Sequence, residues 1–150
     1  HEEPAGRMLD LKAVVAELPE GAHVYCCGPL PMLEAYEQAT AGLPPARVHR
    51  EYFAAKEAAA TAGGFSVVLA RSGKTVPVRA GQTILDCLIE AGVEPTYSCR
   101  EGICGTCEQR VLDGTPDHRD LVQSDAEKAA NDRIMICCSG SRSSRLVLDL

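Results

Sequence analysis

The sequence predicts an α+β chain in two parts, a partial α/β segment followed by a β-grasp domain. Helical and strand patterns alternate over residues 1–53, which is typical of parallel strands joined by crossover helices. An alanine-rich stretch, residues 54–64, ends in two glycines and is the predicted linker. Residues 65–150 then run strand, strand, helix, loop and further strands, which is the order of a β-grasp domain.

The first part is expected to hold two helices and two strands. A helix should follow Asp10, a suitable N-cap, because four apolar residues recur at helical spacing: Leu11, Val14, Val15 and Leu18. A buried strand is expected over 22–26. Pro31 then lies in the first turn of a second helix that ends by Gly42, and its expected inner face is Met32, Leu33, Tyr36 and Ala39. With one further strand at 47–53, this part has too few strands to close a core alone.

The second part begins with a predicted hairpin of strands at 65–69 and 75–78. Thr83 and Asp86 form a T-x-x-D capping box. The helix that they open is expected to end at Gly92 and to bury Ile84, Leu85, Leu88 and Ile89. Further strands are expected at 108–112, 133–136 and 145–148, with a helical turn after Ser124.

Charge and composition exclude some classes of binding partner and indicate the cellular compartment. The net charge of −6 opposes non-specific binding to nucleic acid or to an anionic membrane surface. The apolar runs are shorter than a membrane-spanning helix requires. Eight cysteines are present, and two pairs of them are adjacent in sequence, at 26–27 and 137–138. Because no secretory signal is evident, we expect a reducing, cytoplasmic setting in which clustered cysteines bind metal or carry redox chemistry.

Four of the cysteines have the spacing of an iron–sulfur site. Cys99, Cys104 and Cys107 follow C-x4-C-x2-C, and Cys137 comes after 29 further residues. This is the plant-type spacing for a [2Fe–2S] cluster, in which two sulfide-bridged irons need four thiolates. Gly102 and Gly105 lie where the loop must curl closely and bring N–H groups near the sulfurs.

Other interpretations of the cysteines remain open at this stage. Zinc usually takes two C-x2-C pairs, disulfides require an oxidising compartment, and small buried cysteines need no cofactor at all. Cys87, within an apolar helix pattern, and Cys26 are expected to be core residues of this last kind. Cys138 competes with Cys137 for the fourth ligand position. Spacing favours Cys137, and consecutive residues of a strand point to opposite faces.

The segments SCREGICGTC and MICC resemble the ferredoxin domain of the phthalate dioxygenase reductase and vanillate demethylase reductase family, over residues 64–150. The resemblance implies electron transfer through a [2Fe–2S] cluster, from a reduced flavin and ultimately NADH, to a terminal oxygenase of the Rieske type. The alternative is a redox-sensing or structural iron–sulfur protein without an oxygenase partner.

The front segment YCCGPLPM resembles the nicotinamide-site motif of ferredoxin-reductase-type NAD domains, and RVHREYF resembles the segment that follows it in the reductases. The resemblance implies that Cys27, Gly28 and Pro29 border the nicotinamide and that Phe53 lies near the flavin. The carboxyl end of a strand beside a helix N-terminus is where dinucleotides bind in such sheets. An ordinary strand–turn–helix connection is the alternative.

Two parts of the family's reductases are not recognisable in this sequence: the flavin-binding barrel and the glycine-rich pyrophosphate loop. The chain therefore looks like the C-terminal part of such a reductase. We expect it not to oxidise NADH alone, so its status as an enzyme stays open. FMN and NAD would act only through the missing part or through a flavin-containing partner subunit.

Overall fold

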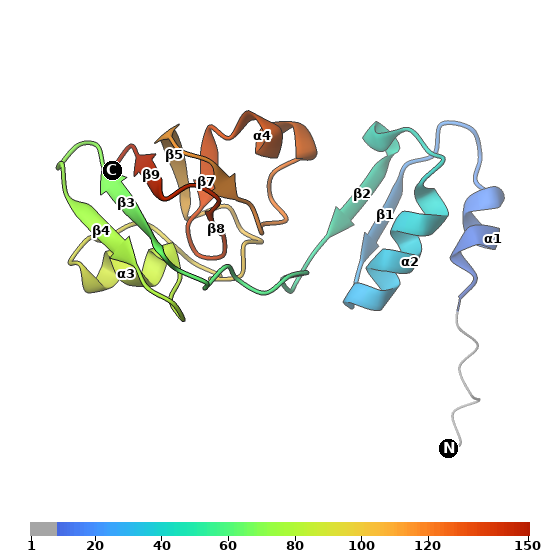
Figure 1. Ribbon diagram of the computed structural model, residues 1–150. Helices are drawn as coiled ribbons and strands as arrows, with labels where there is room; N and C mark the ends of the chain where they lie inside the picture. The colour runs from blue at the N-terminus through green and yellow to red at the C-terminus, as the bar shows by residue number, and fades with distance from the viewer. Residues whose placement is uncertain (1–8) are drawn as a thin grey trace, which may run out of the picture. The chain divides into compact units, whose positions relative to one another are not determined.

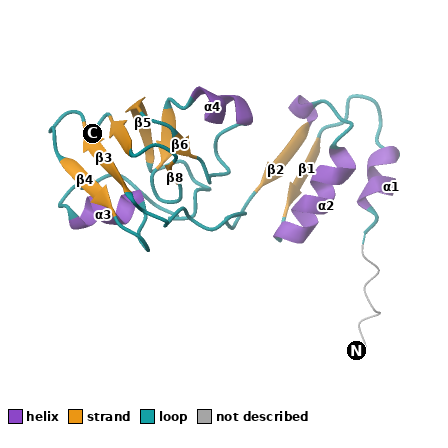
Figure 2. Cartoon of the chain, viewed as in Figure 1, coloured by secondary structure: helices purple, strands orange, loops and turns teal. Residues whose placement is uncertain are grey.

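The computed structural model describes residues 9–150, which divide into two compact units. The first unit extends to Phe53, and the second covers Ala54–Leu150. Helices and strands occur in both units, as Figure 2 shows. Across residues 9–150, the helices are all too short or too polar to cross a membrane.

The first unit is a β-α-β element preceded by a short helix (Figure 1). Strands β1 (Val24–Cys27) and β2 (Val48–Glu51) pair in parallel, with Val24 opposite Val48. Helix α2 (Leu30–Thr40) connects them, and a single 3-10 turn, Pro45–Arg47, leads into β2. The Tyr36 hydroxyl lies 2.9 Å from the Val24 carbonyl oxygen and 3.0 Å from that of His49. It therefore ties the helix to both strands.

The predicted inner faces of these helices are partly wrong. Helix α1 (Leu11–Ala16) is capped by Asp10 as expected, yet none of its residues is buried. Leu33 and Tyr36 are buried in α2, but Met32 is 40% exposed and Thr40 is buried in place of Ala39. A two-stranded sheet covers only a narrow stripe of a helix, so a full amphipathic face has nothing to pack against.

The second unit is built on a five-stranded mixed sheet in the order β4-β3-β9-β5-β7. Its strands are β3 (Phe65–Leu69), β4 (Thr75–Val78), β5 (Glu108–Asp113), β7 (Arg133–Met135) and β9 (Arg145–Leu148). The central pair, β3 and β9, is parallel, and the other pairs are antiparallel. The predicted α+β class, with a β-grasp domain after a partial α/β segment, is confirmed.

Helix α3 (Ile84–Glu90) supplies the other layer of the core (Figure 1). The predicted capping box is present, because Thr83 Oγ1 accepts from Asp86 N and the Asp86 carboxylate accepts from Thr83 N. Cys87 is buried in the core, as expected. Ile89, expected on the buried face, is 37% exposed, since its position turns it toward solvent at the edge of the helix.

Several small features complete the second unit. Helix α4 (Asp125–Ala130) begins at a capping box formed by Ser124 and Glu127, where a helical turn was predicted. Two-residue strands β6 (Pro116–Asp117) and β8 (Gly140–Ser141) pair with each other. In the stretch predicted as linker, no helix forms, and three backbone bonds join it to the rest of the second unit: Ala60 N to Cys138 O, Gly64 N to Val78 O and Gly81 N to Thr61 O.

Candidate functional site

The cysteine loop between α3 and β5 has no regular secondary structure and curls through left-handed backbone conformations. Arg100, Gly102 and Gly105 have φ angles of 61°, 71° and 77°. A Cβ at Gly102 would lie 2.5 Å from Cys138 Sγ and 3.2 Å from Asp120 Cα. Glycine is therefore required at 102 by both backbone and space.

Cys99 and Cys104 form one pair of thiols at the outer part of the loop. Glu101 N donates to Cys99 Sγ over 3.3 Å. Cys104 Sγ lies 3.2 Å from Thr106 Oγ1. Hydrogen bonding to Thr106, followed by hydrogen bonding to Cys99, lowers the pKa of Cys104 to about 6. Such donors stabilise a thiolate, which is the form that binds metal.

Cys107 and Cys137 form the second pair, and both are buried. Cys107 directly precedes β5, Cys137 follows β7, and these strands pair with Glu108 opposite Met135. The strand register therefore brings the two cysteines together. A hydrogen bond between the two thiols, reinforced by burial, raises the pKa of Cys107.

Cys138 takes a different position from Cys137, although not for the predicted reason. The two residues lie in a turn, in which Cys138 N and Ser139 N both donate to Met135 O, so alternation along a strand does not apply to them. Cys138 Sγ is 3.7 Å from Met135 O and 3.8 Å from Ser139 Oγ. It lies under Gly102 and interacts with Cys137, which in turn also interacts with Cys107.

The four thiols suit a two-iron cluster in their chemistry and their grouping. Among residues 9–150, no three His, Cys, Asp or Glu side chains form a group able to hold a single metal ion. Among the predicted ligands, Cys99 interacts with Cys104 and Cys107 interacts with Cys137, which also interacts with Cys138. A [2Fe–2S] cluster uses four thiolates, two on each iron. The donor set and the left-handed loop that carries it therefore fit this cofactor.

The sequence did not single out three of the residues around this loop. Thr106 bonds Cys104, as described above. Arg100 stacks over the Tyr97 ring, 4.8 Å from its centroid, and pairs with Asp86 at 3.3 Å. Asp120 is buried behind Gly102. A polar residue inside the C-x4-C loop was the available signal for Arg100, whereas Asp120 has no periodic or spacing signal.

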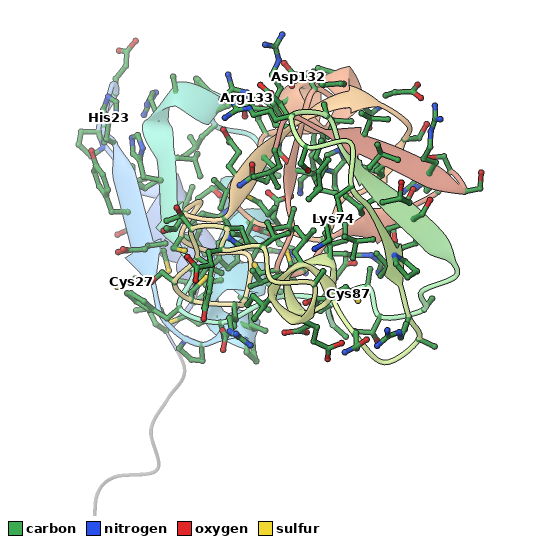
Figure 3. All side chains as sticks on the ribbon, turned by 90° about the vertical axis from the view of Figure 1, so that its left-hand side faces the viewer. His23, Cys27, Lys74, Cys87, Asp132 and Arg133 are labelled. Atoms are coloured by element: carbon green, nitrogen blue, oxygen red, sulfur yellow. The ribbon has the colours of Figure 1, made fainter. Side chains whose placement is uncertain are left out.

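The predicted nicotinamide residues lie at the carboxyl edge of the first unit's sheet. Cys27 ends β1 and is exposed, and Pro29 caps α2 after Gly28. A shallow hollow of about 240 Å³ at this sheet includes Cys27 among its lining residues but not Gly28, Pro29 or Phe53. Phe53 is 63% exposed and follows β2, whose carboxyl end lies beside that of β1. Figure 3 labels Cys27 in this unit and Cys87 in the other.

Comparison with known proteins gives the family of the second unit. A family model described as a 2Fe-2S iron-sulfur cluster binding domain matches residues 67–141, which is half of the chain. The chain belongs to this family. Its cofactor is accordingly a [2Fe–2S] cluster.

Relatives of known function match both units together. The beta subunit of phenoxybenzoate dioxygenase from Ectopseudomonas oleovorans is 66% identical over 95% of this chain and 44% of its own length. A vanillate O-demethylase oxidoreductase from a Pseudomonas strain is 44% identical over 98% of this chain and 47% of its own length. The chain thus spans about half the length of the curated relatives that it matches. The resemblance seen in the cysteine and front motifs is confirmed.

Two solved structures match almost the whole length of the chain. Phthalate dioxygenase reductase, described as a modular structure for electron transfer from pyridine nucleotides to [2Fe-2S], matches with a TM-score of 0.69 and 37% identity, over 100% of this chain and 46% of its own. An intact type IV self-sufficient cytochrome P450 monooxygenase matches with a TM-score of 0.80 and 44% identity, over 97% of this chain and 19% of its own.

Proposed function

We propose that this chain is the C-terminal electron-transfer part of an oxygenase reductase. It receives single electrons from a reduced flavin, ultimately supplied by NADH, and passes them to a terminal oxygenase of the Rieske type. The observation that carries the proposal is that the four predicted cysteine ligands lie grouped within a domain of the [2Fe–2S] cluster-binding family. Relatives that are oxygenase components favour this function over a redox sensor.

The proposed cluster ligands are Cys99, Cys104, Cys107 and Cys137. The bound cluster would supply one-electron chemistry, dividing the two electrons of a hydride donor into single steps. The chain's own residues hold it: the 99–107 loop supplies three thiols, and the turn after β7 supplies the fourth. Burial of Cys107 and Cys137 keeps water from one side of the site.

The remaining cofactor contacts are proposed from the edge of the first unit's sheet. Cys27, Gly28 and Pro29 would border a nicotinamide, with Phe53 near the FMN. A strand end next to a helix N-terminus, which is what Cys27 and α2 provide, supports this placement. FMN and the pyrophosphate of NAD would be bound by a flavin-containing portion or partner subunit, in a reducing cytoplasmic compartment.

The ligand assignment is tested by spectroscopy on the full chain after anaerobic reconstitution with iron and sulfide. We expect a [2Fe–2S] visible spectrum and, after reduction by dithionite, a rhombic EPR signal. Serine at any one of positions 99, 104, 107 or 137 should abolish or strongly alter both. Cys87→Ser and Cys138→Ser are the matched controls. Loss of the cluster in Cys138→Ser with retention in Cys137→Ser contradicts the assignment.

Electron delivery is tested separately by mixing. NADH alone should leave the reconstituted chain oxidised, and NADH with a flavoprotein reductase portion of the family should reduce it. Reduced chain should then reduce a Rieske oxygenase from a related system. If NADH reduces the chain without any flavoprotein, the proposed division of roles is wrong.

A further inference from the structure

The segment 118–123 concentrates buried polar atoms that the site described above does not use. Across residues 9–150, four buried side-chain atoms have no hydrogen-bond partner: Nδ1 of His118, Oδ2 of Asp120, and both amide atoms of Gln123. The Asp120 side chain is 0% exposed and that of His118 is 9% exposed. A buried polar atom without a partner is unfavourable for stability, so a cluster of four calls for an explanation.

This segment forms the wall behind the cysteine loop. Leu121 N donates to Gly102 O over 2.9 Å. Asp120 Cβ lies 3.4 Å from the position that a Cβ on Gly102 would occupy, and Val122 Cγ1 lies at the same distance from the corresponding position on Gly105. Asp120 thus packs through its Cα and Cβ against the loop backbone between Cys99 and Cys104, which fixes its buried carboxyl behind the loop.

The surroundings of Asp120 are those of a carboxylate. Val122 N and Gln123 N both donate to its Oδ1, over 3.1 Å and 2.8 Å, a donor pattern that favours the ionised group. Oδ2 faces His118 Nδ1 at 3.9 Å, which is too far for a hydrogen bond. His118 therefore faces this oxygen at an ion-pair distance, without a hydrogen bond between them.

His118 is held in place on the side of its ring that faces away from Asp120. His118 Nε2 lies 3.2 Å from Asn131 Oδ1, and the Asn131 amide nitrogen donates to Ala129 O. Because an amide oxygen only accepts, Nε2 carries a hydrogen and donates it to Asn131. Nδ1 is the ring nitrogen that faces Asp120.

Other charged groups near Asp120 come from neighbouring elements and do not reach its carboxylate. Lys128 of α4 donates to the Asp120 backbone oxygen over 2.6 Å. Arg119 is turned to Asp117 and Glu57. Cys138, from the turn after β7, is the remaining titratable group that interacts with Asp120.

We propose that Asp120 sets the reduction potential of the cluster by placing a buried negative charge behind the cysteine loop. Reduction adds one electron and hence one negative charge, and a fixed negative charge in a low-dielectric wall opposes that change. The residue acts through the electric field and transfers no proton. This inference rests on the proposed function, since it requires the cluster.

The test compares midpoint potentials of the reconstituted full chain, measured by redox titration with EPR and visible detection. Asp120→Asn keeps the side-chain shape and removes the charge. We expect its equilibrium constant for reduction to rise roughly tenfold. For one electron, this corresponds to a midpoint potential about 59 mV higher than that of the wild type. Asp125→Asn is the matched control, because Asp125 is exposed on α4 and screened by salt. Its potential should equal that of the wild type.

Asp120→Glu distinguishes an effect of the carboxylate charge from an effect of side-chain packing. It retains the negative charge while disturbing the geometry, so we expect a potential near that of the wild type. If the equilibrium constant for reduction of Asp120→Glu rises by the full tenfold, the proposal is wrong. This outcome counts whether or not Asp120→Asn takes up iron. Equal potentials in wild type and a loaded Asp120→Asn overturn it as well.

These outcomes are distinguishable from failure of the proposed function. If the wild-type chain gives no [2Fe–2S] EPR signal, the cluster assignment fails before any potential is compared. If it gives the signal and the potentials of Asp120→Asn and Asp125→Asn coincide, only the role of Asp120 fails.

Discussion

Two glycines with nearly the same backbone conformation show what the cysteine loop demands of single residues. Gly102 and Gly73 have φ angles of 71° and 69°. Nothing lies within 4 Å of a Cβ added to Gly73, whereas one added to Gly102 meets Cys138 Sγ at 2.5 Å. The backbone strain of an added methyl group is the same at the two positions, and the steric conflict is confined to Gly102.

Gly102→Ala and Gly73→Ala can therefore be compared directly. Each should lose about 1 kcal/mol from left-handed strain, and Gly102→Ala should lose a further 1–3 kcal/mol because its methyl group must displace a buried neighbour. The measurement is urea unfolding of the cluster-free chain, accompanied by iron content after reconstitution. Equal losses of stability in the two variants would show that the loop yields to the added methyl group.

At the scale of elements, the short β6–β8 pair is held by charge as well as by backbone bonds. The carboxylate of Asp117 on β6 pairs with Arg119 at 2.8 Å and with Arg142 at 3.3 Å. Burial opposes ionisation of Asp117, but the two guanidinium groups outweigh it and lower the pKa of this carboxyl. A carboxyl whose pKa is lowered by folding stabilises the fold above its unfolded pKa, and this contribution is lost as the pH falls.

Asp117→Asn should thus destabilise the second unit at pH 7, by about 1 kcal/mol for a partly exposed network. As the pH falls below about 4, the usual range for Asp, the wild type should approach the variant. Urea midpoints at pH 7 and pH 3.5 measure this difference. Asp113→Asn, which breaks one exposed pair with Arg145, is the control and should lose less, because water screens that pair. A difference for Asp117→Asn that persists unchanged at pH 3.5 contradicts the charge explanation.

Elements with a local chemical cause were predictable from the sequence. The Asp10 cap, the Thr83 capping box and the Pro31 helix start depend on residues within one turn of each other, and all are present. The strands β6 and β8 were missed because two residues cannot show alternation. The parallel pairing of β9 with β3 depends on chain segments far apart, for which the sequence carries no local signal.

The candidate site divides in the same way. Cysteine spacing predicts a four-thiol site because three ligands share one loop. The contact between Cys107 and Cys137 depends on the register of β5 and β7. The position of Cys138 depends on a turn, where the sequence predicted a strand. Asp120 became visible only through its burial against Gly102, which no sequence pattern encodes.

At the scale of the whole molecule, the two units differ in the size of the buried core that each contains. The second unit buries a continuous set of side chains from its sheet and from α3. The first buries only Leu33, Tyr36 and Thr40 within its helices, and none of its strand residues. A small domain needs a sizeable buried core to be stable. Cooperative folding of this chain should therefore belong to the second unit.

Two truncated fragments test whether the second unit folds without the first, and at which residue its domain begins. A fragment of residues 54–150 should keep the unfolding midpoint and the cluster spectrum of the full chain. A fragment of residues 65–150 matches the predicted domain but lacks three backbone bonds: Ala60 N to Cys138 O, Gly64 N to Val78 O and Gly81 N to Thr61 O. It should lose about 2–3 kcal/mol, because net contributions are near 1 kcal/mol for each hydrogen bond. Equal stability of the two fragments would place the domain start at residue 65, and failure of 54–150 to fold would show that the first unit contributes to the core.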